Sequence, residues 1–131
     1  MNDVWLKELY ERFLISGLEF RDFYDLLNEA IIRNRTTFPA FIYDASRGEG
    51  VSVGEGYYYA LDQEWDDPEA FYEVSFYLGE MESSSIAVAD FVALVDIAAG
   101  VYTRNFPEEK DRVQGSVKRL KERYSKFLGQ H

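Results

Sequence analysis

Carboxylates are the side chains best suited to chemistry in this chain, and half of them lie between residues 48 and 103. This stretch contains no Lys and no Arg, so it accounts for all of the formal net charge of −10. Its acids are Glu49, Glu55, Asp62, Glu64, Asp66, Asp67, Glu69, Glu73, Glu80, Glu82, Asp90 and Asp96. A series of carboxylates along a sheet, with no basic residue among them, indicates binding rather than catalysis.

A small carboxylate-based hydrolase is one alternative function, with Asp62, Glu64 or Glu73 as its acids. Asp62 and Glu64 are two residues apart in a predicted strand, so their side chains would share a face. A glycosidase needs two such carboxyl groups in a cleft, one of them with a raised pKa. However, any protein with many clustered acids offers such pairs, so we expect no enzyme activity.

Other catalytic and cofactor motifs are missing from the sequence. The only histidine is His131, the last residue, and there is no cysteine, which excludes the common nucleophilic triads. Residues 48–50 and 54–56 have the sequence Gly-Glu-Gly, but they lack the Gly-Lys-Ser/Thr ending of a phosphate loop. We interpret them as a turn and a strand bulge, and we predict no cofactor.

A calcium-binding loop is a second possible role for the acidic residues. Asp62, Glu64, Asp66 and Glu73 occupy positions 1, 3, 5 and 12 of such a loop. Position 6, which requires Gly for a sharp turn, is Asp67 instead, and the flanking segments read as strands rather than helices. We therefore predict no specific metal site.

The same acids fit a protein-binding surface better. Carboxylates spaced along an exposed face resemble a phosphate backbone and would attract the basic groove of a nuclease. Nearby aromatic side chains would supply anchors of the kind that dominate interface energies. The predicted partner-binding residues are Tyr58, Asp62, Glu64, Trp65, Asp66, Asp67, Glu69, Glu73 and Tyr77.

Length and composition limit the class of protein. The 131 residues, 47% of them hydrophobic and 17% aromatic, predict one globular domain, residues 1–131. No apolar run is long enough for a membrane span, no signal peptide is visible, and the absence of cysteine favours the cytoplasm. A sequence pI near 4.5 argues against nucleic-acid or membrane binding and favours a basic partner, or simply solubility.

Periodicity predicts helices at both ends of the chain and strands between them. A helix capped by Asn2 or Asp3 ends at residues 16–17, and a second spans residues 19–34. Strands are expected at residues 40–45, 51–63, 71–79 and 84–88. A helix over residues 90–104, apolar nearly all round, should be the most buried. Pro107 starts the last helix, whose basic C-terminal half matches the helix dipole and needs no functional explanation.

This order predicts an α+β domain: two N-terminal helices, an antiparallel sheet of about four strands and two C-terminal helices. The helices should cover one face of the sheet. Strand alternation then places the following residues on the face toward solvent: Tyr58, Asp62, Glu64, Glu73 and Tyr77.

Four segments give the chain a resemblance to a known group of proteins over about residues 40–128. They are Tyr57-Tyr58-Tyr59-Ala60-Leu61-Asp62, Glu73-Val74-Ser75-Phe76, Ala89-Asp90-Phe91 and Lys121-Glu122-Arg123-Tyr124, with an acidic turn to Phe71 between the first two. The arrangement resembles the small acidic immunity proteins of bacterial polymorphic-toxin systems, in particular those of contact-dependent growth inhibition. This resemblance implies a cytosolic monomer that forms a one-to-one complex with the C-terminal domain of a cognate toxin, often a nuclease, and occludes its active site. A regulatory interaction domain with no toxin partner is the remaining alternative.

Overall fold

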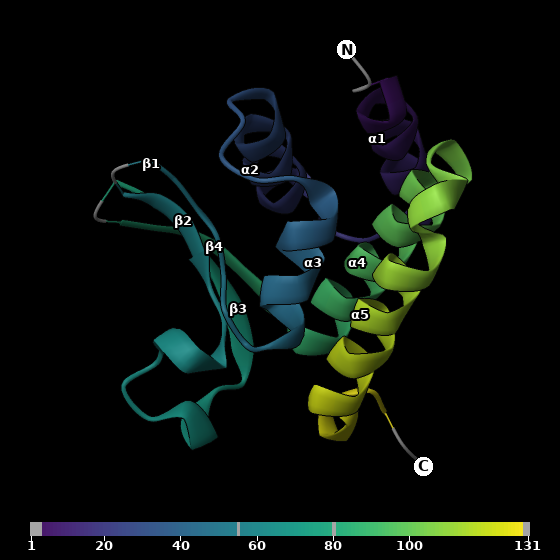
Figure 1. Cartoon of the computed structure of the whole chain (residues 1–131). Helices are drawn as coiled ribbons and strands as arrows, with labels where there is room; N and C mark the ends of the chain where they lie inside the picture. The colour runs from purple at the N-terminus through teal and green to yellow at the C-terminus, as the bar shows by residue number, and fades with distance from the viewer. Residues whose placement is uncertain (1–3, 55, 80, 130–131) are drawn as a thin grey trace.

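Helices and strands lie in separate layers of the molecule, with the sheet on one side of a group of five α-helices (Figure 1). The computed structural model describes residues 4–54, 56–79 and 81–129. The predicted caps Asn2 and Asp3, the acids Glu55 and Glu80, and His131 lie outside the described residues. Within these ranges the predicted α+β class and antiparallel sheet are confirmed.

The first two helices follow the predicted amphipathic pattern. Helix α1 spans Val4–Ser16 and α2 spans Arg21–Ile32. Aromatic side chains join them: the ring centroids of Phe13 and Phe23 are 5.9 Å apart in an edge-on contact. The two apolar stripes therefore bury each other.

Residues 40–45, predicted as the first strand, are instead helical, and this prediction was wrong. Helix α3 spans Phe38–Ser46. Thr37 caps it by accepting a hydrogen bond from the Ala40 amide, and Pro39 lies in its first turn, where proline is favoured. Gly48 ends it with a φ of +83°, a conformation that glycine adopts without strain.

The sheet is a four-stranded antiparallel meander in the order β1-β2-β3-β4. Its strands are β1 Ser52–Gly54, β2 Tyr57–Ala60, β3 Glu73–Leu78 and β4 Met81–Ala87. The single predicted strand over residues 51–63 is thus two strands, with the expected irregularity between Ser52 and Gly54. The observed sheet has the predicted number of strands, because the first predicted strand is a helix but the second predicted strand is two strands.

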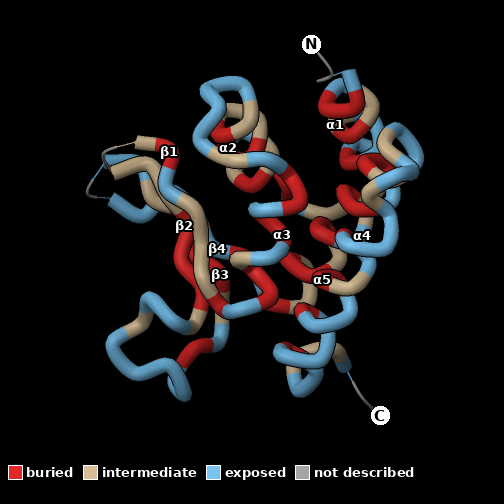
Figure 2. Tube along the Cα trace, in the orientation of Figure 1, coloured by how far each residue is buried: buried red, intermediate tan, exposed pale blue. Residues whose placement is uncertain are grey.

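Helices α4 (Val88–Asn105) and α5 (Lys110–Arg123) complete the helical layer. Helix α4, predicted to be the most buried helix, buries the largest number of side chains, nine of its 18, but α3 buries the larger fraction, six of its nine. Figure 2 shows this buried interior running through α3, α4 and the inner side of the sheet.

The two faces of the sheet differ as the alternation predicted. Tyr59 of β2 points inward, and its ring centroid lies 5.7 Å from that of Phe41 and 5.6 Å from that of Phe91. Tyr58 and its cross-strand partner Tyr77 therefore lie on the opposite face, away from the helices. This outer face carries the candidate site.

Candidate functional site

The connection between β2 and β3, residues 61–72, forms the acidic end of the outer face. It contains two 3₁₀ turns, Asp62–Glu64 and Pro68–Ala70. Asp67 begins the second turn by accepting a hydrogen bond from the Glu69 amide at 3.1 Å. Most of the loop is exposed, as the pale blue segment below the strands in Figure 2 shows. The two short turns fix the backbone of this loop, so its exposed carboxylates start from fixed positions.

Asp62 holds this loop against the end of α5. Its carboxylate accepts hydrogen bonds from Arg123 Nε at 3.1 Å and Arg123 Nη2 at 2.7 Å. The Tyr124 hydroxyl donates a third, at 2.6 Å. We call this arrangement of Asp62, Arg123 and Tyr124 the clasp. The Asp62 side chain is only 13% exposed, so it contributes to the position of the loop rather than to the outer surface.

The clasp lowers the pKa of Asp62 below its ordinary value. Burial acts to raise this pKa, but the hydrogen bonds from Arg123, Tyr124 and Gln63 outweigh it. Burial and the bond to Asp62 raise the pKa of the Tyr124 hydroxyl, which therefore stays protonated as a donor. The clasp thus favours a charged carboxylate and a neutral phenol.

Gly48 leaves room for the clasp. A Cβ atom at this position would lie 2.6 Å from both Arg123 Nη2 and Asp62 Oδ1. The Gly48 carbonyl also accepts a hydrogen bond from the Gln63 amide at 3.0 Å. The end of α3, the acidic loop and the end of α5 therefore meet at one point.

Glu64 is exposed, but its carboxylate also binds the backbone. Its carboxylate accepts a hydrogen bond from the Leu61 amide at 2.6 Å and from the Gly50 amide at 3.0 Å. Burial raises the pKa of Glu64 despite these backbone bonds. The carboxylate therefore joins the acidic loop to the chain that follows α3.

Three predicted aromatic residues surround a cavity of about 360 Å³ on the outer face. The rings of Tyr58 and Tyr77 stack with centroids 4.7 Å apart and planes 12° apart. Trp65 comes from the loop and is fixed by edge-on contacts with Phe71 at 5.3 Å and Tyr72 at 5.6 Å. We call this cavity the aromatic pocket. Its lining residues are Tyr58, Ala60, Glu64, Trp65, Asp66, Asp67, Ala70 and Tyr77.

The carboxylates of Asp66 and Asp67 form no ion pair with the described residues. Both residues line the cavity and are exposed. Glu69 and Glu73 do not line the cavity, but they also form no ion pair with a described Lys or Arg, and Glu73 accepts a hydrogen bond from Ser85 at 3.2 Å. Their negative potential is therefore available to a partner.

The structure groups most of the predicted site residues, but not all of them. Six of the nine line the aromatic pocket: Tyr58, Glu64, Trp65, Asp66, Asp67 and Tyr77. Glu69 lies on the second 3₁₀ turn, and Glu73 lies on the outer face of β3. The prediction that Asp62 and Glu64 extend the exposed face of a strand was wrong, because β2 ends at Ala60 and both residues lie in a 3₁₀ turn, where Asp62 is largely covered by its partners and Glu64 stays exposed.

Sequence reasoning missed two contributors to this region. In the predicted strand over residues 71–79, alternation with Glu73 places Tyr72 on the inward face, but β3 begins only at Glu73 and the Tyr72 side chain is 63% exposed beside Trp65. Arg123 was attributed to the helix dipole alone. Its pairing with Asp62 joins residues 61 positions apart, and no local spacing signals such a contact.

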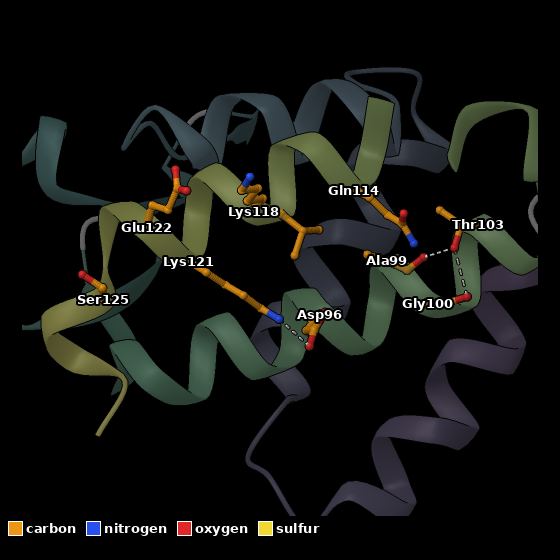
Figure 3. A pocket seen from close by; sticks show the side chains of 10 residues that line it. Asp96, Ala99, Gly100, Thr103, Gln114, Lys118, Lys121, Glu122 and Ser125 are labelled. Atoms are coloured by element: carbon orange, nitrogen blue, oxygen red, sulfur yellow. Dashed lines mark hydrogen bonds and ion pairs between the residues drawn. The ribbon is translucent and has the colours of Figure 1, made fainter. Parts of the chain in front are cut away.

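A larger cavity, about 560 Å³, lies between α4 and α5, where Ala99 and Gly100 leave space (Figure 3). Lys121 of α5 reaches across to Asp96 of α4, with 3.1 Å between Nζ and Oδ2. Lys118 and Glu122 add one charge of each sign to the lining, so no net charge points to a ligand. The aromatic pocket is the better candidate because its charge is of one sign.

Metal and membrane sites receive no support from the described residues. Within residues 4–54, 56–79 and 81–129, no group of three or more His, Cys, Asp or Glu side chains is arranged to hold a metal ion. Two of the acids whose spacing matches a calcium loop have other partners: Asp62 binds Arg123 and Glu64 binds backbone amides. In the same described ranges, no helix has both the length and the apolar character needed to cross a bilayer.

Comparison of the chain with protein-family models, with curated proteins and with solved structures found no significant match. The functional argument therefore depends on the aromatic pocket, the surrounding carboxylates and the clasp.

Proposed function

We propose that this chain is an immunity-type inhibitor that binds and neutralises a basic bacterial toxin domain, a nuclease, in the cytoplasm. The observation that carries the proposal is the aromatic pocket, whose exposed carboxylates have no described basic partner. A nuclease active site is basic because it binds phosphate, so it complements this surface in charge. Binding there would cover the active site and prevent access of nucleic acid.

The anatomy of the aromatic pocket supports a protein partner. Interface energy concentrates in a few aromatic anchors with a polar rim around them. Trp65 and the stacked pair of Tyr58 and Tyr77 provide the anchors, and Asp66 and Asp67 lie at the rim. The clasp and the Glu64 bonds position the loop before binding, which reduces the ordering cost on association.

The hydrolase alternative has less support. Its two candidate carboxylates, Asp62 and Glu64, are already occupied by Arg123, Tyr124 and backbone amides. A glycosidase pair must instead be directed at the substrate from both sides of the scissile bond. The same side chains support the binding surface by fixing the acidic loop.

The direct test needs the cognate toxin: we expect a large toxin gene immediately upstream of the gene for this chain, and its C-terminal domain is the partner to co-purify. Co-purification should give a one-to-one complex, and nuclease activity should fall linearly to zero at one equivalent of inhibitor. A complex without loss of nuclease activity would favour a regulatory interaction domain instead. Turnover of a substrate by the purified chain alone, abolished by Asp62→Asn with folding intact, would favour the hydrolase.

A matched pair of variants locates the interface. Trp65→Ala should weaken inhibition by on the order of 2 kcal/mol, mainly through a faster off-rate. Tyr43→Ala removes an aromatic side chain that is 47% exposed on α3, away from the pocket, and should leave inhibition unchanged. Equal effects of the two variants would place the interface elsewhere.

A further inference from the structure

The geometry points to a specific chemical group for the aromatic pocket: the guanidinium of one arginine side chain, supplied by the partner protein. This inference rests on the proposed function, since it names the group through which the partner engages the site. The supporting feature is the combination of aromatic walls with carboxylates in one cavity, rather than the acidic cluster itself.

The aromatic walls favour a cation with an apolar stem. Aromatic ring faces attract cations that lie within about 6 Å of the ring centroid. Tyr58, Tyr77 and Trp65 line one cavity, and the small apolar residues Ala60 and Ala70 also belong to its lining. An arginine stem can therefore pass over small apolar residues while its charged end lies against an aromatic ring.

The carboxylates favour a positive group with several donors. Asp66 and Asp67 lie in adjacent positions of the lining, and neither is neutralised by a described basic residue. Glu64 also lines the cavity, but its oxygens already accept hydrogen bonds from the Gly50 and Leu61 amides. Among the described residues, Asp66 therefore offers both carboxylate oxygens to an entering group, and Asp67, whose Oδ1 accepts from the Glu69 amide, offers its other oxygen.

Guanidinium fits this combination better than an ammonium group. It is planar, it stacks on aromatic rings, and its fork of donors matches carboxylates in bidentate geometry. It is also more weakly hydrated, so entry into a partly apolar cavity costs less. The volume of about 360 Å³ lies near the lower end of the range for small-ligand pockets, about 300–1,000 Å³, which suits a single side chain.

The test is a titration of the isotope-labelled protein with N-acetyl-arginine-amide, followed by NMR. The indole N–H signal of Trp65 should shift and saturate, whereas that of Trp5, which is 3% exposed in the core, should not move. N-acetyl-lysine-amide should bind more weakly, and the uncharged isostere N-acetyl-citrulline-amide should not bind. An unmoved Trp65 signal, or equal shifts with citrulline, would overturn the inference.

Paired variants test the carboxylates. Asp66→Asn with Asp67→Asn keeps the size of both side chains and the capping ability of residue 67. It should weaken arginine binding roughly tenfold, equivalent to about 1.4 kcal/mol. The control, Glu11→Gln with Glu19→Gln, removes two exposed charges from the helical side and should leave binding unchanged. If both double variants lost the same arginine affinity, the effect would come from the net charge of the protein alone, and the assignment would be overturned.

The two proposals fail in different ways. If the chain inhibits the upstream nuclease but the arginine probe does not bind, the inhibitor function stands and the guanidinium assignment is wrong. If the probe binds at Trp65 but the nuclease is neither bound nor inhibited, the guanidinium assignment stands and the proposal of a toxin partner is wrong.

Discussion

At the scale of single residues, the acids of the central stretch divide into two kinds according to what they contact. Asp62 is largely covered by its contacts with Arg123 and Tyr124, whereas Glu64, Asp66 and Asp67 are exposed and line the aromatic pocket. The sequence shows four similar carboxylates within six positions, and composition alone cannot separate them. Strand alternation did identify Tyr58 and Tyr77, because a period of two holds inside a regular strand and ends where β2 ends.

The clasp should contribute stability that depends on pH. Asp62→Asn should lower the free energy of unfolding by about 1–2 kcal/mol at neutral pH, since charge-assisted hydrogen bonds become neutral ones. Folding lowers the pKa of Asp62 below its ordinary value of 3.8, so the folded protein favours the carboxylate. The contribution is therefore complete above about pH 5 and is lost as the pH falls through the folded pKa.

Urea unfolding of both proteins at a series of pH values measures this difference. It should be constant near neutrality and shrink below the ordinary Asp62 pKa of 3.8. Asp66→Asn is the control: this exposed side chain has no described ion pair, so its effect should stay within about 0.5 kcal/mol. A difference that grew toward acid pH would contradict the role assigned to the clasp.

Tyr59 offers a second prediction at this scale. Its hydroxyl is buried and has no hydrogen-bond partner among the described residues. Tyr59→Phe should therefore leave the free energy of unfolding unchanged or raise it by up to about 1 kcal/mol, because no bond is lost and a desolvated polar group is removed. The measurement is chemical denaturation of the two proteins.

Tyr24→Phe is the matched control, because the Tyr24 hydroxyl donates to the Leu6 carbonyl at 3.0 Å. Its loss should cost about 0.5–1.5 kcal/mol. If Tyr59→Phe were as destabilising as Tyr24→Phe, the Tyr59 hydroxyl would have a partner in solution.

At the scale of elements, long periodic segments were predictable and short ones were not. Helices α1, α2, α4 and α5 each repeat their apolar positions over several turns. Helix α3 has only nine residues, and an apolar run of that length fits either a strand or a helix. Thr37, Pro39 and Gly48 carried the helix signal: a cap, a first-turn proline and a glycine stop.

Helix α4 should be the element least tolerant of a buried charge. Val95 is fully buried in its middle, and an unpaired carboxylate there costs several kcal/mol, comparable to the stability of a whole domain. Val95→Asp should therefore unfold the protein, as circular dichroism and proteolysis would show. Val4→Asp, at a position of α1 that is 72% exposed, should fold normally. A folded Val95→Asp protein would contradict the packing described for α4.

At the scale of the whole molecule, charge is separated between the acidic central stretch and the basic residues elsewhere in the chain. Every Lys and Arg lies outside residues 48–103, and Lys118 and Arg119 lie on α5 in the helical layer. This separation along the chain can be read directly from the sequence. Which of these acids reach the outer face depends on the fold. Asp62 pairs with Arg123 and Asp96 pairs with Lys121, so neither adds an unpaired charge to the outer face.

The charge separation should govern association with a basic partner. The on-rate should fall markedly as salt rises, because charges beyond a Debye length of about 8 Å are screened at physiological ionic strength. Glu69→Gln should mainly lower the on-rate, since Glu69 lies exposed on the acidic loop. Stopped-flow association with the toxin domain across a salt series measures both effects.

Lys118→Glu and Lys121→Glu provide the control on the helical side, and each should change the on-rate little. A salt-independent on-rate, or a larger loss from these lysine variants than from Glu69→Gln, would move the interface to α5.

The clasp also sets an order of events during protein synthesis. Its partners are separated by 61 residues, and translation proceeds at about 5–20 residues per second, so roughly 3–12 seconds pass between their appearances. The strand pairs of the meander join neighbouring segments, so they can form during this interval. The clasp can therefore form only after the end of α5 has left the ribosome, so the acidic loop, which carries the candidate binding surface, is fixed in place later than the strands can pair.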